Sequence, residues 1–211
     1  MTAYHFYEPR LGHGLKHDPL NMIVAPRPIG WISSLSAKGV RNLAPYSFFN
    51  LFNYKPPIIG FSSIGWKDSI ANVAETREFG WSLATRSLAE QMNASCAEVG
   101  PEVDEFALAK LTPAPSRLIK APRVAESPVS FECRLTQLIK LQTAEGGEIE
   151  TWVAFGEVVA VYIDKSLLKD GIYDTVAADP ISRGGGPADY FTITEANRFQ
   201  MYRPGAKVAA E

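Results

Sequence analysis

RPIGWISSLSAKGVRNLAPYSFFN, residues 27–50, is the stretch that decides the fold. Its segment IGWISSLS, at 29–36, predicts a strand, because β-branched and aromatic residues favour strands. Ala37-Lys38-Gly39 supplies a hairpin turn, and residues 41–50 return as a second strand. We therefore expect an antiparallel sheet that begins here and extends into the rest of the chain.

Further strands are expected downstream. Residues 129–142 alternate, with Phe131, Cys133 and Leu135 on one face and charged or polar residues on the other. A Gly-Gly turn at 144–148 then joins two long strands. Hairpin-linked strands without repeated βαβ units predict a mainly β, antiparallel barrel with peripheral helices. The downstream strands are expected at 57–64, 79–84, 129–142 and 151–163.

Two helices should be inserted between these strands. Asp68 or Ser69 can cap a helix at 68–77, in which Ile70, Val73 and Ala74 share a face. The capping box Ser87-Leu88-Ala89-Glu90 opens a second helix to about Ala97. The proline-rich segment 100–127 is interpreted as a surface excursion with one short helix at 104–109, and 165–211 as irregular, with Gly184-Gly185-Gly186 in a flexible loop.

Composition narrows the class of protein. The chain has 211 residues, 46% of them apolar and 21% charged, which is typical of one globular domain. A net charge of −2 argues against a nucleic-acid or anionic-membrane binder. No uncharged run approaches the length of a membrane span, and no apolar leader opens the chain. Cys96 and Cys133 form no CxxC, so reduced thiols and a cytoplasmic location are expected.

Several catalytic motifs do not occur. The sequence has no GxGxxG after a strand, no GxxxxGK[ST] and no GxSxG, so Rossmann, P-loop and hydrolase interpretations lack support. His5, His13 and His17 are the only histidines. Although His13 and His17 are four residues apart, they lie in a Gly/Pro-bounded stretch, and we expect solvated loop histidines rather than a metal site or a Ser-His-Asp triad.

Charge is segregated along the chain. Residues 19–67 contain no Asp or Glu, yet they carry Arg27, Lys38, Arg41, Lys55 and Lys67. Serines and aromatic residues are abundant in the same stretch. Half of the serines should simply face solvent, and most of the rings should be core. Together, however, they suit a small ligand with an anionic end and a flat apolar end. Lys67 or Arg27 could supply the counter-charge to the anion. The positive end of a helix dipole near Asp68 would also favour the anion.

These residues also carry a family resemblance. The chain resembles the flavin reductase-like, FMN-binding split-barrel family, and more narrowly its flavoredoxin-type branch. The resemblance spans about residues 21–190, with 1–20 and 191–211 as extensions outside it. The matching motifs lie at 27–34, 42–50, 56–57, 61–63, 67–69, 72–76, 78–79, 103–106, 126–129, 132–133 and 156–159.

The resemblance implies a homodimer of six-stranded Greek-key barrels that hold FMN non-covalently near the dimer interface. No residue is assigned a catalytic role, because the flavin carries the chemistry. The residues implied in the flavin pocket are Trp31, Ile32, Ser33 and Ser34. Arg27 belongs to the matching motif at 27–34 and is a candidate counter-charge for the phosphate. Those implied beside the ring or ribityl chain are Ala44, Pro45, Tyr46, Ser47 and Asn50. Those implied around the phosphate are Ser62, Ser63, Lys67 and Ser69, and Arg183 and Tyr190 are implied as a cover over the flavin.

The activity implied is that of an FMN-dependent oxidoreductase. NAD(P)H would deliver hydride to flavin N5, and electrons would pass to an acceptor that the sequence does not identify. The alternatives are a flavoredoxin-like electron carrier without its own NAD(P)H turnover and a non-catalytic flavin-binding module. A pyridoxamine-phosphate-oxidase-like enzyme on a related barrel is disfavoured by the motif at 27–34.

Overall fold

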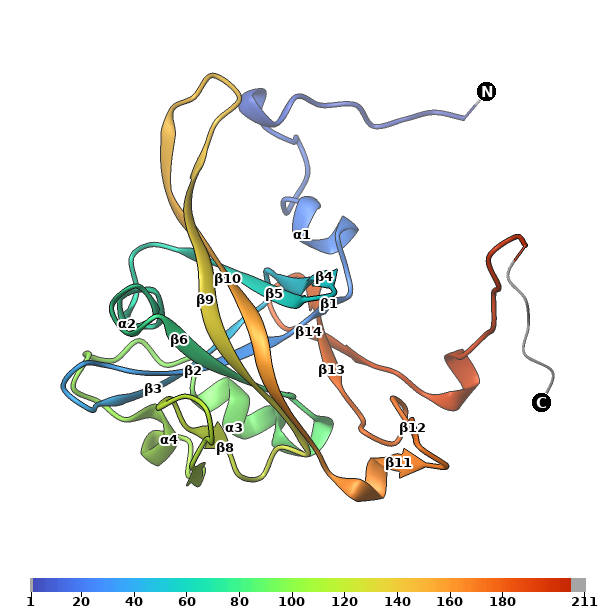
Figure 1. Cartoon of the computed structure of the whole chain (residues 1–211). Coiled ribbons are helices and arrows are strands. Elements are labelled where there is room, and N and C mark those ends of the chain that lie inside the picture. The colour runs from blue at the N-terminus through green and yellow to red at the C-terminus, as the bar shows by residue number, and fades with distance from the viewer. Residues whose placement is uncertain (1, 206–211) are drawn as a thin grey trace.

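One large antiparallel sheet dominates the computed structural model, which describes residues 2–205 (Figure 1). Seven strands follow one another in the order β3-β2-β6-β9-β10-β5-β4, and the sheet curls into an open barrel. The expected mainly β, antiparallel barrel is confirmed. The strands are β2 (Gly30–Leu35), β3 (Arg41–Tyr46), β4 (Phe49–Tyr54), β5 (Pro57–Ile64), β6 (Glu78–Ser82), β9 (Val129–Gln142) and β10 (Glu148–Ile163).

The segment 41–50 differs from its prediction. It is not one strand, because bends at Ser47 and Phe48 separate β3 from β4. β3 pairs with β2 in the expected hairpin, with Ser34 opposite Asn42. β4 instead pairs with β5 and forms the other edge of the sheet. The sheet therefore has seven strands where the resemblance implied six.

Helix α2 (Asp68–Thr76) lies where it was expected, but its cap was predicted wrongly. Lys67 is the N-cap residue, and no side chain caps the helix. Ser69 lies inside the first turn, and its hydroxyl donates instead to Oδ1 of Asn42 at 2.6 Å. The apolar face is confirmed at Ile70 and Val73, which are fully buried.

The second helix is shorter than predicted. It begins with the 3-10 turn η2 (Arg86–Leu88), continues as α3 (Ala89–Ala94) and stops before Ala97. The predicted capping box is wrong, because the Ser87 hydroxyl bonds Thr85 Oγ1 at 2.9 Å. The excursion that follows contains the short helix α4 (Glu105–Leu108), whose N-cap residue Asp104 accepts a hydrogen bond from the Phe106 amide at 3.0 Å. It also contains a short pair of strands, β7 (Pro113–Ala114) and β8 (Arg123–Val124).

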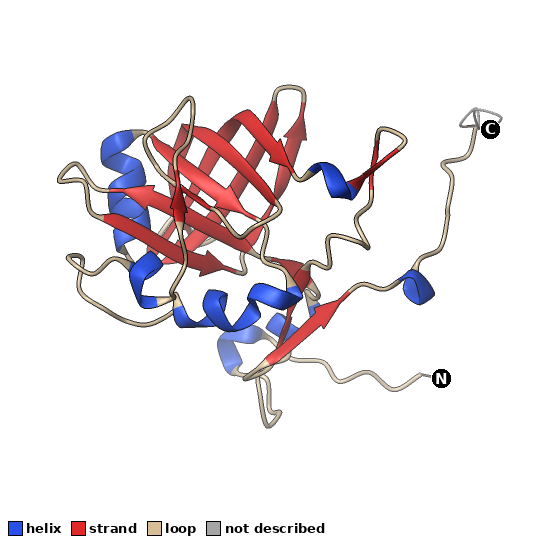
Figure 2. Ribbon diagram, turned by 90° about the horizontal axis from the view of Figure 1, so that it is seen from below, coloured by secondary structure: helices blue, strands red, loops and turns tan. Residues whose placement is uncertain are grey.

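Strand β2 lies between two hydrophobic cores. Ile32 faces the barrel interior with Phe61 and Phe79, under α2. Trp31 faces the opposite way, into a second core that α3, α4 and the rest of the excursion build with Leu43. This arrangement buries both faces of β2, and the helices cover the outer face near β3 (Figure 2).

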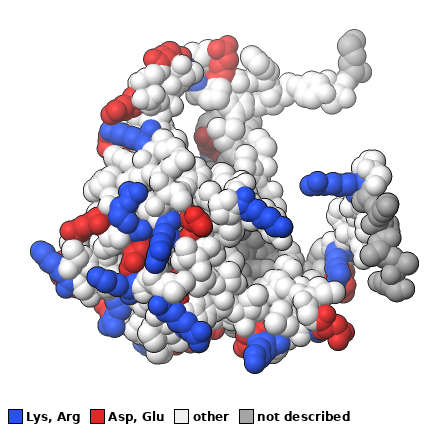
Figure 3. Space-filling view, viewed as in Figure 1, with Lys and Arg blue, Asp and Glu red and all other residues white. Residues whose placement is uncertain are grey.

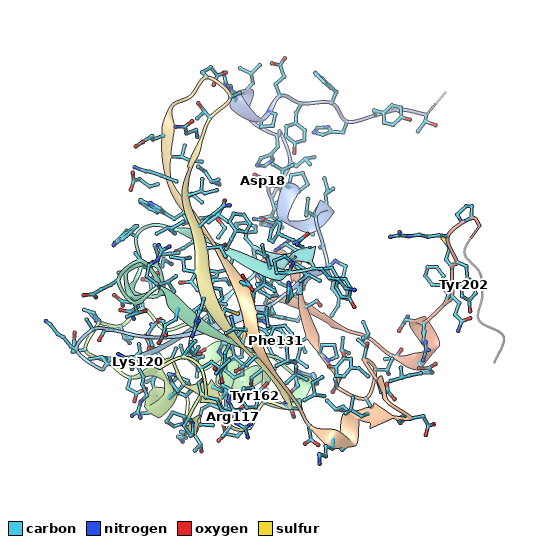
Figure 4. All side chains as sticks on the ribbon, viewed as in Figure 1. Asp18, Arg117, Lys120, Phe131, Tyr162 and Tyr202 are labelled. Carbon is cyan, nitrogen blue, oxygen red and sulfur yellow. The ribbon has the colours of Figure 1, made fainter. Side chains whose placement is uncertain are left out.

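The polar face predicted for β9 is also covered. Glu132 is fully buried, because the excursion packs over this face of the strand. Its carboxylate accepts from the amides of Arg117 at 2.7 Å and Leu118 at 2.6 Å, and from the Tyr162 hydroxyl. Figure 4 shows Arg117 and Tyr162 near each other at this end of the barrel. Burial raises the pKa of Glu132, but these hydrogen bonds more than offset it, and the pKa is lowered overall.

Residues 165–211 were expected to be irregular, and the described part of them contains more strand than that. β13 (Ile181–Gly185) pairs with β14 (Asp189–Thr192) and with β1 (Arg27–Pro28) in a separate three-stranded sheet. Gly184 is part of β13 rather than of a flexible loop. A Cβ atom there would lie 2.4 Å from the Phe191 ring, which explains why a residue without a side chain stands at this position. The other short elements are η1 (Pro9–Leu11), α1 (Leu20–Ile23), η3 (Lys165–Leu167), β11 (Leu168–Lys169), β12 (Ile172–Tyr173) and η4 (Glu195–Asn197).

Both chain ends extend away from the barrel in the ribbon views (Figures 1 and 2) and in the space-filling view (Figure 3). Arg10 forms an ion pair with Glu145 at the tip of the β9–β10 hairpin, and Tyr202 lies on the C-terminal arm, well clear of the sheet (Figure 4). The two extensions expected at the ends fall partly outside the described residues, at Met1 and at 206–211. Between residues 2 and 205, no helix is long and apolar enough to cross a membrane.

Candidate functional site

A pocket of about 310 Å³ opens at the edge strand β3, at the foot of α2. Such a volume is at the small end of the range for ligand sites. Four segments that are separated in the sequence meet here: β3, the first turn of α2, the chain that follows α3 and the start of α4. We call this the β3 pocket; it is lined by Asn42, Ala44, Pro45, Tyr46, Lys67, Asp68, Ser69, Ser95, Cys96, Ala97, Glu98, Val99 and Glu105.

A buried hydrogen-bond network holds the walls of the β3 pocket together. Asn42 Oδ1 accepts from Ser34 at 3.1 Å and from Ser69 at 2.6 Å, while its Nδ2 donates to Glu105 Oε1 at 3.0 Å. Asn72 Nδ2 donates to the Ser34 hydroxyl at 3.1 Å. The network therefore joins β2, β3, α2 and α4 through side chains that are all buried.

Glu105 connects the network to the excursion. Its second oxygen accepts from the backbone N–H of Leu43 at 3.1 Å, an edge-strand amide that would otherwise lack a partner there. Burial raises the pKa of Glu105, and the hydrogen bonds from Leu43 and Asn42 oppose that rise. The neighbouring Asp104 also pairs with Arg41. The start of α4 is thus held against β3 by two adjacent carboxylates.

Tyr46 closes the pocket on the barrel side. Its ring contacts that of Phe61, with 4.8 Å between centroids. Burial raises the pKa of the Tyr46 phenol, while the hydroxyls of Ser69 and Ser63 lower it. Tyr46 therefore presents a neutral hydroxyl among other hydroxyls, next to an apolar ring surface.

Positive charge in the pocket comes from the foot of α2. Among the described residues, Lys67 is the one Lys or Arg that lines the pocket, and it is exposed. The first amides of a helix have no acceptor within the helix, so they favour an anion at this end. Asp68 and Glu98 also line the pocket and oppose an anion, while Glu105 is occupied by the network. The residues present accommodate a phosphate close to Lys67 but offer it little excess positive charge.

Five of the residues implied by the resemblance line this pocket together: Ala44, Pro45, Tyr46, Lys67 and Ser69. Ser63 lies beside Tyr46, although its hydroxyl donates to the Gly65 carbonyl at 3.0 Å. Ser62 is half-buried, and its backbone amide donates to the Phe48 carbonyl at 2.8 Å. The expected grouping at the foot of α2 therefore exists in space, and its contact with a cofactor stays a prediction.

The residues implied on β2 are buried and already have protein partners. Trp31 Nε1 donates to Ser95 Oγ at 3.0 Å, and the Ser33 hydroxyl donates to the Pro122 carbonyl at 2.5 Å. Ile32 packs in the barrel core, and Ser34 belongs to the network. These side chains support the pocket from behind, and Trp31 does so directly by holding Ser95 in its wall.

Arg27 and Ser47 lie elsewhere and contact each other. The Arg27 guanidinium donates to the carbonyls of Ser47 at 3.1 Å, Asn21 at 2.5 Å and Val24. It does not line the β3 pocket, so Lys67 remains as the candidate counter-charge. Asn50 lies on β4, where its side chain accepts from the Leu51 amide at 2.8 Å, and it lines an apolar groove.

Arg183 and Tyr190 line a second, larger pocket of about 720 Å³ between α3 and the β13–β14 hairpin. The two pockets share Cys96. Burial raises the pKa of the Cys96 thiol, and the charges of Lys67 on one side and Arg183 on the other lower it. The pockets therefore adjoin at this residue.

The sequence analysis missed the third wall of the β3 pocket. Residues 95–99 form this wall and carry no recognisable motif. They lie against β3 only in the folded chain, so the sequence alone does not indicate the contact. The matched motif at 103–106 contains Glu105 and was the one signal that could have pointed to it. Hydrophobic periodicity could not, because it does not identify a buried carboxylate. Among the described residues, no group of three His, Cys, Asp or Glu side chains is arranged to hold a metal ion.

Comparisons with known proteins agree with this architecture. The family described as "Flavin reductase like domain" matches residues 22–181. An uncharacterized protein of Aquifex aeolicus is 37% identical over 172 residues, which cover 78% of this chain and 83% of that protein.

Two solved structures are similar throughout. Nitrilotriacetate monooxygenase component B from Bacillus cereus is 30% identical with a TM-score of 0.84, over 95% of this chain and 100% of that one. The 2-nitrobenzoate 2-nitroreductase of Pseudomonas fluorescens is 26% identical with a TM-score of 0.81, over 99% of this chain and 100% of that one.

Proposed function

The chain belongs to the flavin reductase-like family, and from this premise we propose that it is an FMN-dependent oxidoreductase that accepts hydride from NAD(P)H. The two similar solved structures carry names of redox proteins, one a monooxygenase component and one a nitroreductase. That agreement supports flavin-dependent redox chemistry as the general class. The preference for FMN and the NAD(P)H donor are our proposals.

The β3 pocket is the observation that carries the proposal. It combines Lys67 and the amino end of α2 with the apolar and aromatic surface of Ala44, Pro45 and Tyr46. This arrangement matches a ligand with a phosphate at one end and a flat ring at the other. The separate location of Arg27 means that the phosphate would rely on Lys67.

The protein residues bind and orient in this proposal. Bound FMN would supply the redox chemistry by accepting hydride from NAD(P)H and passing electrons to an acceptor. Lys67 would hold the phosphate, and the neutral Tyr46 hydroxyl would offer a hydrogen bond without adding negative charge. The Asn42 network would fix the distance between these two groups, because it bonds both β3 and the first turn of α2.

We also propose a homodimer, formed through an apolar groove on the β4 side of the barrel. The groove has a volume of about 340 Å³ and includes Phe49 and Trp81, whose rings stack at 5.8 Å between centroids. Leu51 and Tyr54 line this groove from the edge strand β4, and both are exposed. An exposed, apolar edge strand tends to pair with another chain, and a second copy of this chain would cover it.

Steady-state oxidation of NADH and NADPH by the flavin-loaded protein tests the proposal. Turnover with either nucleotide supports the reductase. A bound, reducible flavin that turns over with neither nucleotide would refute the hydride-donor part and favour an electron carrier. A bound flavin that chemical reductants cannot reduce would favour a binding module without redox activity.

A further inference from the structure

The larger pocket next to the β3 pocket has a fixed shape. Arg183 crosses the turn of the β13–β14 hairpin and donates to the carbonyls of Gly185 at 3.2 Å, Gly186 at 2.8 Å and Asp189 at 2.9 Å. Its guanidinium also lies 5.0 Å from the centroid of the Tyr190 ring. Arg183 is therefore used in holding the hairpin, and it positions Tyr190 as an aromatic wall.

Arg86 is the other arginine of this pocket, and it is available. It lies at the start of η2, where its backbone amide donates to the Asp179 carbonyl at 2.9 Å. The adjacent residues Thr85 and Pro180 form a β-bridge, so the backbone at the base of the side chain is held. Within residues 2–205 the exposed Arg86 guanidinium has no ion pair or hydrogen bond. Glu90 is the carboxylate in the lining and partly offsets this charge.

We propose that this pocket binds the nucleotide half of NADPH, with Arg86 contacting the 2′-phosphate. The inference rests on the proposed function, because it assigns a place to the hydride donor. An arginine near the ribose is a recognised way for proteins to accept a 2′-phosphate.

Position and size support a dinucleotide in this place. The pocket adjoins the β3 pocket at Cys96, so a molecule lying in it reaches the proposed flavin site without crossing the barrel. Its volume of about 720 Å³ is more than twice that of the β3 pocket. Tyr190 and Phe191 offer aromatic surface, and Asn93 offers an amide, which suits a flat base joined to a polar sugar.

The first test measures binding to the flavin-loaded protein by calorimetry, with 2′-phospho-ADP-ribose and ADP-ribose as probes. These probes are redox-inactive and differ by the 2′-phosphate alone. We expect the phosphorylated probe to bind about tenfold more tightly, which is a typical contribution of one charged hydrogen bond. Arg86→Ala should abolish that preference while leaving flavin content unchanged. Lys38→Ala, which removes an exposed positive charge from the β2–β3 turn, should retain it.

A second test locates the probe. Cys133 is fully buried and Cys96 is exposed, so a thiol reagent applied to the folded protein should react at Cys96. Saturating 2′-phospho-ADP-ribose should slow that reaction at least severalfold, in the wild-type protein and in Lys38→Ala. An unchanged rate with bound probe would place the probe elsewhere and overturn the assignment of this pocket.

The two proposals fail in distinguishable ways. A purified protein that binds no flavin refutes the proposed function before any nucleotide is added. A flavin-loaded protein that binds both probes equally, or whose Arg86→Ala variant keeps the preference, refutes the Arg86 assignment and leaves the flavin site intact. Loss of flavin from Arg86→Ala would show that the flavin itself extends into this pocket, which also overturns the inference.

Discussion

The Ser69 hydroxyl lies 2.6 Å from Oδ1 of Asn42, and this hydrogen bond joins the first turn of α2 to the edge strand β3. It holds the β3 wall and the α2 wall of the β3 pocket together. Asn42 also contacts Ser34 and Glu105, so one amide side chain satisfies three buried polar groups. The shape of the candidate flavin site therefore depends on Asn42, a buried residue of its lining.

Asn42→Ala should lower the free energy of unfolding by about 1–3 kcal/mol, because it leaves buried hydroxyl and carboxylate groups without a partner. Urea denaturation measures this directly. Asn53→Ala is the matched control, since its amide makes an exposed hydrogen bond to the Pro56 carbonyl, and it should cost less than about 1 kcal/mol. Equal costs for the two variants would show that the Asn42 network is energetically unimportant.

Lys67→Ala should weaken FMN binding at least tenfold, or about 1.4 kcal/mol, as measured by flavin fluorescence titration. Riboflavin, which lacks the phosphate, is the internal control, and its affinity should change little. Adding Ser63→Ala should have a smaller further effect, because that hydroxyl already bonds the Gly65 carbonyl. If FMN and riboflavin lose affinity equally, the phosphate does not lie at Lys67.

Asp68→Asn should have the opposite effect on FMN affinity. Asp68 lines the β3 pocket beside Lys67, so its negative charge would oppose a phosphate bound there. Removing that charge should tighten FMN binding by a few-fold, and the gain should shrink as salt concentration rises. Weaker FMN binding by the variant would argue against a phosphate at this end of α2.

Glu132 should make the free energy of unfolding decrease as the pH is lowered. Its folded-state pKa is lowered, so its contribution is present above the unfolded pKa of about 4.3 and is lost as pH falls through the folded value. Glu132→Gln should reduce stability at pH 7 by about 1–3 kcal/mol and flatten the decline in stability as pH falls below about 5. Urea midpoints across this range measure both effects, with the exposed Glu75→Gln as control. An unchanged pH slope would contradict this role.

Leu51→Asp should prevent the proposed dimer. Leu51 is 54% exposed on the edge strand β4 and lines the apolar groove, so a charge there would be buried in the interface. Light scattering after gel filtration should give a dimeric mass for the wild type and a monomeric mass for the variant. Ile172→Asp changes a residue that is 72% exposed on the β11–β12 hairpin and should stay dimeric. A monomeric wild type would refute the dimer.

Sequence patterns predicted the elements whose cause is local. Strand β5 was predicted with its observed bounds, and α2 within one residue, because apolar runs and helical periodicity are read within a few residues. The split between β3 and β4 was missed. At the break, the Ser47 carbonyl accepts a hydrogen bond from Arg27, 20 residues away, and such a distant contact is not visible in a local pattern. The β13–β14 hairpin was also missed, because its pairing with β1 and the Arg183 hydrogen bonds across its turn are not visible as strand periodicity.

The candidate site was predictable in part. Lys67, Ser69 and Tyr46 were grouped by charge, hydroxyl content and family resemblance, and they do meet in one pocket. Alternation along a strand explains why the group on β2 divides: Ile32 and Ser34 face the α2 side, while Trp31 and Ser33 face the excursion. The sequence does not tell which of these two pairs faces the candidate flavin site, because both faces of β2 are buried.

The visible absorption spectrum of the purified protein, before and after denaturation, tests the central claim most directly. We expect the two absorbance bands of a flavin in the folded protein, release of the flavin on denaturation, and identification of the released molecule as FMN by its mass. A protein that purifies without these bands and does not acquire them when titrated with FMN would contradict the account.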